Sequence, residues 1–353
     1  MRPGCRVPSI TIAFLTWLCT CTAPASAILT SYGNMDTVRL MLGRSDEYWT
    51  QLAGLMQEVS LPSSFDGKPQ RMLFYNPGAR GPRPLLVALH SWSSTYRQSF
   101  SIPYSQWAQD NDWILVLPDY RGRFQTPYAL SDAAEADVID ALSYAYENAA
   151  VDRSRVYLTG YSGGATMGLL LAARHPELLS AIAVWSPIFD LTEWYRSVRR
   201  RDWHYPDNVE RICGGNPLRS SRAEEACTER SPARYLDQHK LKRLYIFLAT
   251  GLDDHFVPPI HSIWSYNRLV SAKDIMPENP AQLIGDIEPS PELELFGAAG
   301  ADILISRNSD RKSLRIYRGR HDVIYNAALQ WLDTRTRRAD RPPLLKSPAD
   351  RPY

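Results

Sequence analysis

Three things are scarce in this chain of 353 residues: cysteine, long apolar runs, and an excess of charge of either sign. The apolar run Ile10–Cys19 is far shorter than the roughly 20 residues that span a bilayer, which excludes an ordinary membrane-spanning helix there. It follows Arg2 and Arg6 and precedes Ala25-Ser26-Ala27, small residues of the kind that a signal peptidase accepts. We therefore expect residues 1–27 to be a cleaved signal peptide, with export to the periplasm or the cell exterior and no stable membrane anchor.

A lipoprotein anchored through Cys19 or Cys21 is the alternative to cleavage. Leu18 and Thr20 precede these cysteines, where a small Gly, Ala or Ser is normal. Export with cleavage is the better interpretation of the leader.

Charge is balanced once the leader is removed. The loss of Arg2 and Arg6 leaves 38 basic and 38 acidic residues. This balance gives no electrostatic reason to expect nucleic acid as a partner. Of the five cysteines, only Cys213 and Cys227 lie outside the leader. In an oxidising compartment such a pair predicts a disulfide, and metal binding is the weaker alternative because no pair of His residues lies nearby.

What the sequence does contain, from Pro84 onward, is a regular alternation of short apolar runs and helical stretches. This alternation is typical of parallel strands that are buried on both faces. The expected strands are 85–89, 113–117, 155–159, 181–185, 244–249 and 314–317. The expected helices are 132–148, 164–174, 260–271 and 323–334. Together they predict an α/β fold with a doubly wound, mostly parallel sheet.

The remaining segments are expected to be peripheral to this sheet. Apolar residues recur at helical spacing over 37–59, so residues 28–57 are expected to form an N-terminal helical segment. A hairpin of strands 58–62 and 70–75 is expected around Asp66-Gly67. Residues 189–242 interrupt the alternation and are expected to form a cap over the carboxyl ends of the strands. The Pro/Gly-rich stretch 277–309 is expected to be loop, and residues 336–353 a disordered tail.

The motif Gly160-Tyr161-Ser162-Gly163-Gly164 matches G-x-S-x-G between an expected strand and an expected helix. Small flanking residues allow a sharp turn that lifts the Ser162 hydroxyl above the sheet. The helix N-terminus behind it offers unpaired N–H groups to a developing oxyanion. The motif therefore predicts a nucleophilic Ser162, and the alternative is a Gly-rich turn with an incidental serine.

The stretch 155–187 resembles the nucleophile region of α/β-hydrolases, particularly of the prolyl-oligopeptidase-like branch. Further matches are Gly214-Gly215-Asn216-Pro217, Arg230-Ser231-Pro232, and Gly251-Leu252-Asp253-Asp254 followed by Val257-Pro258. The resemblance implies an α/β-hydrolase domain over residues 58–335. The propeller of the large peptidases is not expected, because only about 57 residues separate the leader from strand 85–89. This favours the single-domain, esterase-like members.

The resemblance also implies a triad in the chain order Ser, Asp, His. The family pattern places the acid three residues after Gly251 and four before Pro258, which selects Asp254, with Asp253 as its neighbouring competitor. His321 is expected to be the base, because it follows the last strand and precedes the final helix. The backbone N–H groups of Gly163 and Trp92 are the expected oxyanion donors, although relatives often carry Gly where this chain has Ser91.

Four residues are candidates for contact with a substrate: Tyr161, Trp194, Arg196 and Trp203. Aromatic rings can stack on sugar or phenolic rings, and arginines can bind carboxylates. The alternative is a solvated basic helix face whose tryptophans are anchored in the core.

These features predict a serine hydrolase that works through an acyl-enzyme and needs no cofactor and no metal. An ester on a polysaccharide or a plant-derived acid is the first candidate substrate. A serine peptidase of the same branch is the alternative, and a non-catalytic hydrolase-fold binding protein is a third possibility. The oligomeric state is left open.

Overall fold

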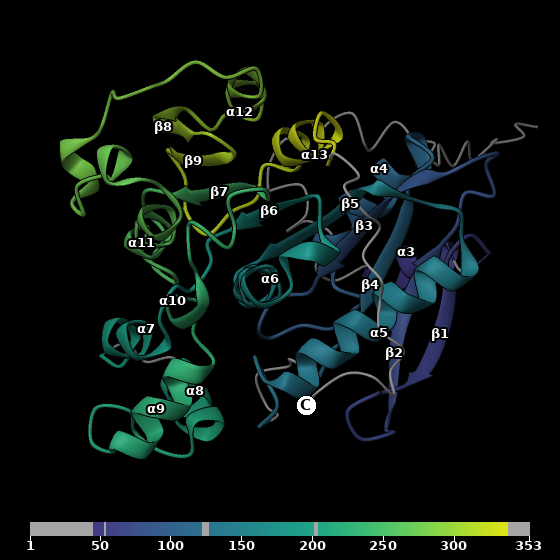
Figure 1. Ribbon diagram of the computed structural model, residues 1–353, viewed down its shortest axis with the longest axis horizontal. Helices are drawn as coiled ribbons and strands as arrows, with labels where there is room; N and C mark the ends of the chain where they lie inside the picture. Colours follow the sequence, from purple (N-terminus) through teal and green to yellow (C-terminus); the bar gives the residue numbers. More distant parts are fainter. Residues whose placement is uncertain (1–44, 53, 122–126, 201–203, 338–353) are drawn as a thin grey trace, which may run out of the picture.

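The computed structural model describes residues 45–52, 54–121, 127–200 and 204–337. Within them, nine strands form one sheet in the order β1-β2-β4-β3-β5-β6-β7-β9-β8 (Figure 1). The strands are β1 (Gln57–Pro62), β2 (Pro69–Tyr75), β3 (Arg83–Leu89), β4 (Ile114–Pro118), β5 (Val151–Tyr161), β6 (Ala181–Trp185), β7 (Tyr245–Gly251), β8 (Ile303–Ser309) and β9 (Lys312–Tyr317). All neighbours from β4 to β9 pair in parallel, whereas β1–β2, β2–β4 and β8–β9 are antiparallel.

The central strands bury side chains on both faces. In β3, Leu85, Val87 and Leu89 belong to the core on one side, whereas Leu86 and Ala88 belong to the core on the other. This double burial explains why the strand is a continuous apolar run rather than an alternating one.

Helices cover both faces of the sheet (Figure 1). One face carries α5 (Asp132–Asn148), α6 (Gly163–Arg174) and α11 (Ile260–Leu269). The other carries α4 (Ile102–Asp110), α12 (Leu293–Ala298) and α13 (Tyr325–Asp333), and α3 (Ser45–Gln51) adds the buried Trp49 to it. The predicted doubly wound α/β fold is therefore confirmed, and each of the six predicted central strands overlaps an observed one.

The helix expected over 37–59 is wrong in its second half, and residues 37–44 lie outside the described residues. The described helix ends at Gln51, and strand β1 begins at Gln57. The helical spacing of Trp49 and Met56 has another cause, because both side chains are buried in the same core from different elements.

The loop expected over 277–309 is also wrong in part. It contains α12 and strand β8, which pairs with β9 through a tight turn at Asp310, a residue with a positive φ of 50°. β8 is an edge strand, so only one of its sides needs a partner strand, and its polar second half (Arg307, Asn308 and Ser309) gives little apolar signal.

The tail expected from residue 336 begins as ordered chain. The Tyr157 hydroxyl donates to the carbonyl of Arg335 over 2.6 Å, and the N–H of Arg337 donates to the carbonyl of Ser154 over 2.9 Å. Residues 338–353 lie outside the described part of the chain, as does the expected signal peptide 1–27.

The segment between β6 and β7 forms the cap, visible as the group of helices α7–α10 in Figure 1. These are α7 (Leu191–Val198), α8 (Tyr205–Cys213), α9 (Ser221–Glu229) and α10 (Pro232–Tyr235). A disulfide joins Cys213 at the end of α8 to Cys227 in α9, as the sequence predicts. Of the helices in the described ranges, none is both long and apolar enough to cross a membrane.

Candidate active site

Ser162 occupies a strained turn between a strand and a helix. It lies between the end of β5 and the start of α6, with φ 56° and ψ −118°. A non-glycine residue with positive φ is uncommon and costs free energy, so the surrounding structure must fix it. Its N–H donates to the carbonyl of Trp185 over 2.9 Å. Position 160, two residues before Ser162, requires a glycine because strand and helix approach closely there: a Cβ on Gly160 would lie 2.4 Å from the carbonyl oxygen of Gly164.

Asp254 and His321 form a direct pair. Oδ2 of Asp254 lies 2.6 Å from Nδ1 of His321, and their side chains are 0% and 12% exposed. The other oxygen, Oδ1, accepts from the N–H groups of Phe256 and Val257, each over 2.9 Å. Since an ionised carboxylate only accepts, Nδ1 carries the proton and Nε2 is left to accept one. Asp253, the competitor, is exposed to solvent.

The neighbours of the serine and of the acid enclose His321. The Tyr161 hydroxyl donates to the His321 carbonyl over 2.7 Å, and the two rings lie 4.6 Å apart. The ring of Phe256 lies 5.2 Å from the imidazole. Burial raises the pKa of the Tyr161 phenol well above its usual range, so this hydroxyl remains a donor. The imidazole is thus fixed by backbone and ring contacts as well as by the carboxylate.

The backbones of Gly163 and Trp92 are in close contact beside the turn. A Cβ on Gly163 would lie 2.8 Å from both the nitrogen and the Cα of Trp92, so the helix start and the loop after β3 are in close contact. The N–H of Gly163, in the first turn of α6, has no partner within its helix. The expected roles of these two N–H groups as oxyanion donors stay predictions.

Aromatic rings connect the cap to this site. Trp194 of α7 lies 5.4 Å from the ring of Trp92 and 5.4 Å from that of Tyr205. Tyr205 in turn lies 6.2 Å from Phe256, which is 38% exposed. Phe256 and Tyr205 are not among the site residues predicted from the sequence, although Phe256 falls inside the matched stretch between Asp254 and Pro258. Its position beside the imidazole depends on how the acid loop folds.

Of the four predicted substrate contacts, the three that lie in the described ranges are not brought together. Tyr161 is buried against His321, and Trp194 is 2% exposed with its indole N–H bound to the Phe256 carbonyl. Arg196 lies on the outer face of α7, 55% exposed, and pairs with Glu193. Because α7 buries its apolar face, this side chain is turned to solvent, and its contact with a substrate stays a prediction. Trp203 lies outside the described residues.

No metal site is assigned. In the described ranges, no group of three or more His, Cys, Asp and Glu side chains is arranged to hold a metal ion. Two further buried histidines make contacts within the fold. His261 accepts from the N–H of Phe189, and His90 stacks on Tyr120 with ring centroids 4.3 Å apart.

Curated relatives align with part of the chain. The acetylxylan esterase of Coprinopsis cinerea is 32% identical over 137 residues, which cover 35% of this chain and 37% of the relative. The feruloyl esterase B of Neurospora crassa is 27% identical over 162 residues, 42% of this chain and 54% of the relative. The matched segments thus span from about a third to about half of these relatives' lengths.

Solved structures share the fold over a longer range. Acetyl xylan esterase 1 from Thermoanaerobacterium sp. superposes with a TM-score of 0.51 at 16% identity, covering 82% of this chain and 92% of that one. A Mycobacterium tuberculosis puromycin-hydrolysing peptidase gives a TM-score of 0.52 at 15% identity, covering 79% of this chain and 38% of that one. Such likeness shows a common fold and leaves the reaction open.

The family model gives the most extensive sequence match. Residues 98–277, just over half of the chain, match the model described as the prolyl oligopeptidase family. The matched range contains the elbow at Ser162, the whole cap and Asp254, and it ends before His321. This chain belongs to the prolyl oligopeptidase family.

Proposed function

We propose that this protein is a serine hydrolase that cleaves carboxylic esters on plant polysaccharides, with Ser162, Asp254 and His321 as its triad. The observation that carries the proposal is the 2.6 Å pair between Asp254 Oδ2 and His321 Nδ1, on loops that follow β7 and β9 of the same parallel sheet as β5. In an α/β sheet the carboxyl ends of parallel strands share one edge, where ligands bind.

In the proposed mechanism, Ser162 Oγ attacks the ester carbonyl and its proton passes to His321 Nε2. Asp254 keeps the proton on Nδ1 and stabilises the imidazolium that forms. The N–H groups of Gly163 and Trp92 bind the oxyanion. His321 then returns the proton to the leaving alcohol, and a water molecule hydrolyses the acyl-enzyme by the same steps.

The esterase assignment is supported by the curated relatives, which are named acetylxylan and feruloyl esterases. A serine peptidase is the second candidate, because the family model and a solved neighbour carry peptidase names. Export is part of the proposal, and the Cys213–Cys227 disulfide supports it because such bonds persist in oxidising compartments.

Parallel assays decide between the two reactions. The purified protein is incubated with acetylated xylan, p-nitrophenyl acetate, a feruloyl ester and a series of aminoacyl and peptidyl anilides. The proposal expects release of acetate or ferulate and rates on anilides at the level of the Ser162→Ala control. Cleavage of anilides with no turnover of any ester would replace it with the peptidase.

A further inference from the structure

A cavity of about 760 Å³ lies at the carboxyl ends of β3 and β4, and none of the catalytic residues proposed above lines it. Its size falls within the range typical of small-molecule sites. Loops at the carboxyl ends of β3 and β4 supply much of its wall, through Ser94 to Phe100 and Asp119 to Arg121. Glu58 of β1 and Arg71 of β2 complete one side.

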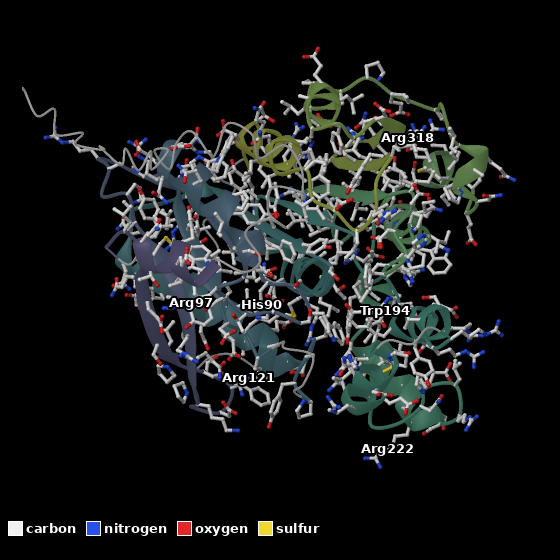
Figure 2. The ribbon with its side chains drawn as sticks, turned by 180° about the vertical axis from the view of Figure 1, so that it is seen from behind. His90, Arg97, Arg121, Trp194, Arg222 and Arg318 are labelled. Atoms are coloured by element: carbon white, nitrogen blue, oxygen red, sulfur yellow. A yellow bond between two sulfur atoms is a disulfide. The ribbon has the colours of Figure 1, made fainter. Side chains whose placement is uncertain are left out.

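Two successive ring contacts connect the wall of the cavity to His321. Phe100 lines the cavity, and its ring lies 5.5 Å from that of Tyr161, which lies 4.6 Å from His321. The loop that carries Ser94 also carries Trp92, a proposed oxyanion donor. In Figure 2, His90 from the start of this loop appears between Arg97 on the cavity side and Trp194 of the cap.

The charges around the cavity cancel. Its lining includes three arginines and three acids: Arg71, Arg97, Arg121, Asp46, Glu58 and Asp119. The arginines already have partners. Arg97 pairs with Glu58, Arg71 lies 3.9 Å from the same carboxylate, and Arg121 binds Asp137 over 2.8 Å. An anionic ligand would therefore compete with these carboxylates for the same guanidinium groups.

Hydroxylated ligands fit this wall better. Gln70, Ser94 and Thr95 add neutral polar groups to the lining. Phe100 is half-buried and adds aromatic surface. Tyr96 is only 5% exposed, and the guanidinium groups of Arg71 and Arg97 each lie 5.7 Å from its ring. A sugar hydroxyl can both donate and accept, so it can use amides, hydroxyls and paired charges alike, while its ring packs against an aromatic face.

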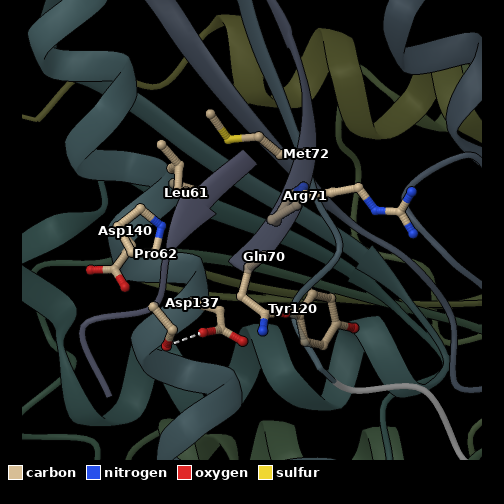
Figure 3. Close-up of a pocket in the computed structure, with 11 residues that line it drawn as sticks. Leu61, Pro62, Gln70, Arg71, Met72, Tyr120, Asp137 and Asp140 are labelled. Atoms are coloured by element: carbon tan, nitrogen blue, oxygen red, sulfur yellow. Dashed lines mark hydrogen bonds between the residues drawn. The ribbon is translucent and has the colours of Figure 1, made fainter. Parts of the chain in front are cut away.

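A second cavity is too small to hold a ligand. It measures about 10 Å³, close to the least volume that admits one water molecule, and it lies against Asp137 and Asp140 of α5. The Ser63 hydroxyl donates to Asp137 there over 2.6 Å. Figure 3 shows the Arg71 guanidinium pointing away from both acids. This space is part of a buried polar network and has no room for a ligand.

We propose that the large cavity binds neutral sugar units of the polysaccharide that neighbour the esterified one. This inference rests on the proposed function and adds to it a place for the chain of the substrate. It makes Ser94 and Arg97 binding residues for carbohydrate that the triad argument does not require.

Binding is measured by calorimetry with xylohexaose, which has no ester to cleave, on the Ser162→Ala protein. Ser94→Trp is added to fill the cavity, and Arg97→Ala to remove a guanidinium group, with thermal unfolding used to verify folding. Arg222→Ala, on the exposed outer surface of the cap (Figure 2), is the matched control. We expect Kd to rise by at least about tenfold, or 1.4 kcal/mol, in both cavity variants and to stay the same in the control.

Absence of xylohexaose binding to the Ser162→Ala protein, or an unchanged Kd in both folded cavity variants relative to that parent, would overturn the proposal. Release of acetate from acetylated xylo-oligosaccharides by the unmodified protein tests the proposed function separately. If acetate is released and the cavity variants bind like their parent, only the cavity proposal fails. If no acetate is released but xylohexaose binding is lost in both variants, the cavity is established and the ester assignment fails.

Discussion

The indole N–H of Trp194 donates to the backbone carbonyl of Phe256 over 2.8 Å. The N–H of the same Phe256 donates to Oδ1 of Asp254 over 2.9 Å. Phe256, in the loop that follows β7, is therefore bound through its carbonyl by the cap and through its N–H by the carboxylate that contacts His321. The cap thus contributes to the geometry of the Asp254–His321 pair.

Removing that N–H should reduce catalysis more than binding. Trp194→Phe keeps an aromatic ring but leaves the Phe256 carbonyl without its donor, at a cost of about 1 kcal/mol for a lost hydrogen bond. We expect kcat on p-nitrophenyl acetate to fall by about fivefold with KM little changed. Tyr195→Phe is the control on the same helix, because its hydroxyl binds Glu210 inside the cap. An equal loss of kcat in both variants would assign the effect to general loosening of the cap.

The two adjacent acids should differ strongly. Asp254→Asn places an amide against Nδ1 of His321 and favours the wrong tautomer, so kcat should fall on the order of 10⁴-fold. Asp253→Asn alters an exposed group and should change kcat by less than about threefold. Steady-state kinetics on one ester measures both. A larger loss for Asp253→Asn than for Asp254→Asn would show that Asp253 is the acid and would contradict the assignment of Asp254.

Acid should destabilise the fold through His261. This side chain is 1% exposed, and burial lowers its pKa to about 3, below the 6.5 of an unfolded chain. The unfolded state therefore binds more protons between these values, and stability contributed by this group falls as the pH drops from about 6.5 toward 3, by up to about 1.4 kcal/mol per pH unit. His261→Asn keeps an acceptor for the N–H of Phe189. Urea unfolding at pH 4.5 and 7 should show a smaller pH dependence in the variant; equal slopes would contradict the assignment.

The disulfide should stabilise the cap. Cys213 and Cys227 are buried, and closing a loop of about 15 residues contributes roughly 3 kcal/mol. Replacing both by serine should loosen α8 and α9 and raise KM for the ester more than it lowers kcat. Limited proteolysis with mass analysis should detect new cleavage between residues 205 and 229. Unchanged proteolysis and unchanged KM would show that the cap is held by its apolar contacts alone.

The fold was predictable where burial on both faces leaves a continuous apolar run, as in β3 and β6. It was not predictable in β8, an edge strand with polar residues whose pairing depends on the neighbouring β9. The expected helix over 37–59 failed for a related reason. Trp49 and Met56 share a core without sharing a helix, and periodicity alone does not distinguish the two cases.

The candidate triad could be selected from local patterns because each member follows a strand of recognisable type. The contacts that fix the position of the triad residues could not be predicted from such patterns. Trp194 reaches Phe256 through a backbone carbonyl, and Tyr161 reaches His321 in the same way, and no side-chain pattern encodes a carbonyl acceptor. Arg196 was selected by residue type, although the apolar face of α7 turns it to solvent.

The central claim is that Ser162 is the nucleophile, and labelling with a fluorophosphonate probe followed by peptide mass spectrometry tests it most directly. The account predicts one adduct, on the peptide that contains Ser162, and none on the folded Ser162→Ala variant, which also loses nearly all ester turnover. Full labelling of Ser162→Ala, or an adduct on another serine of the unmodified protein, would contradict it.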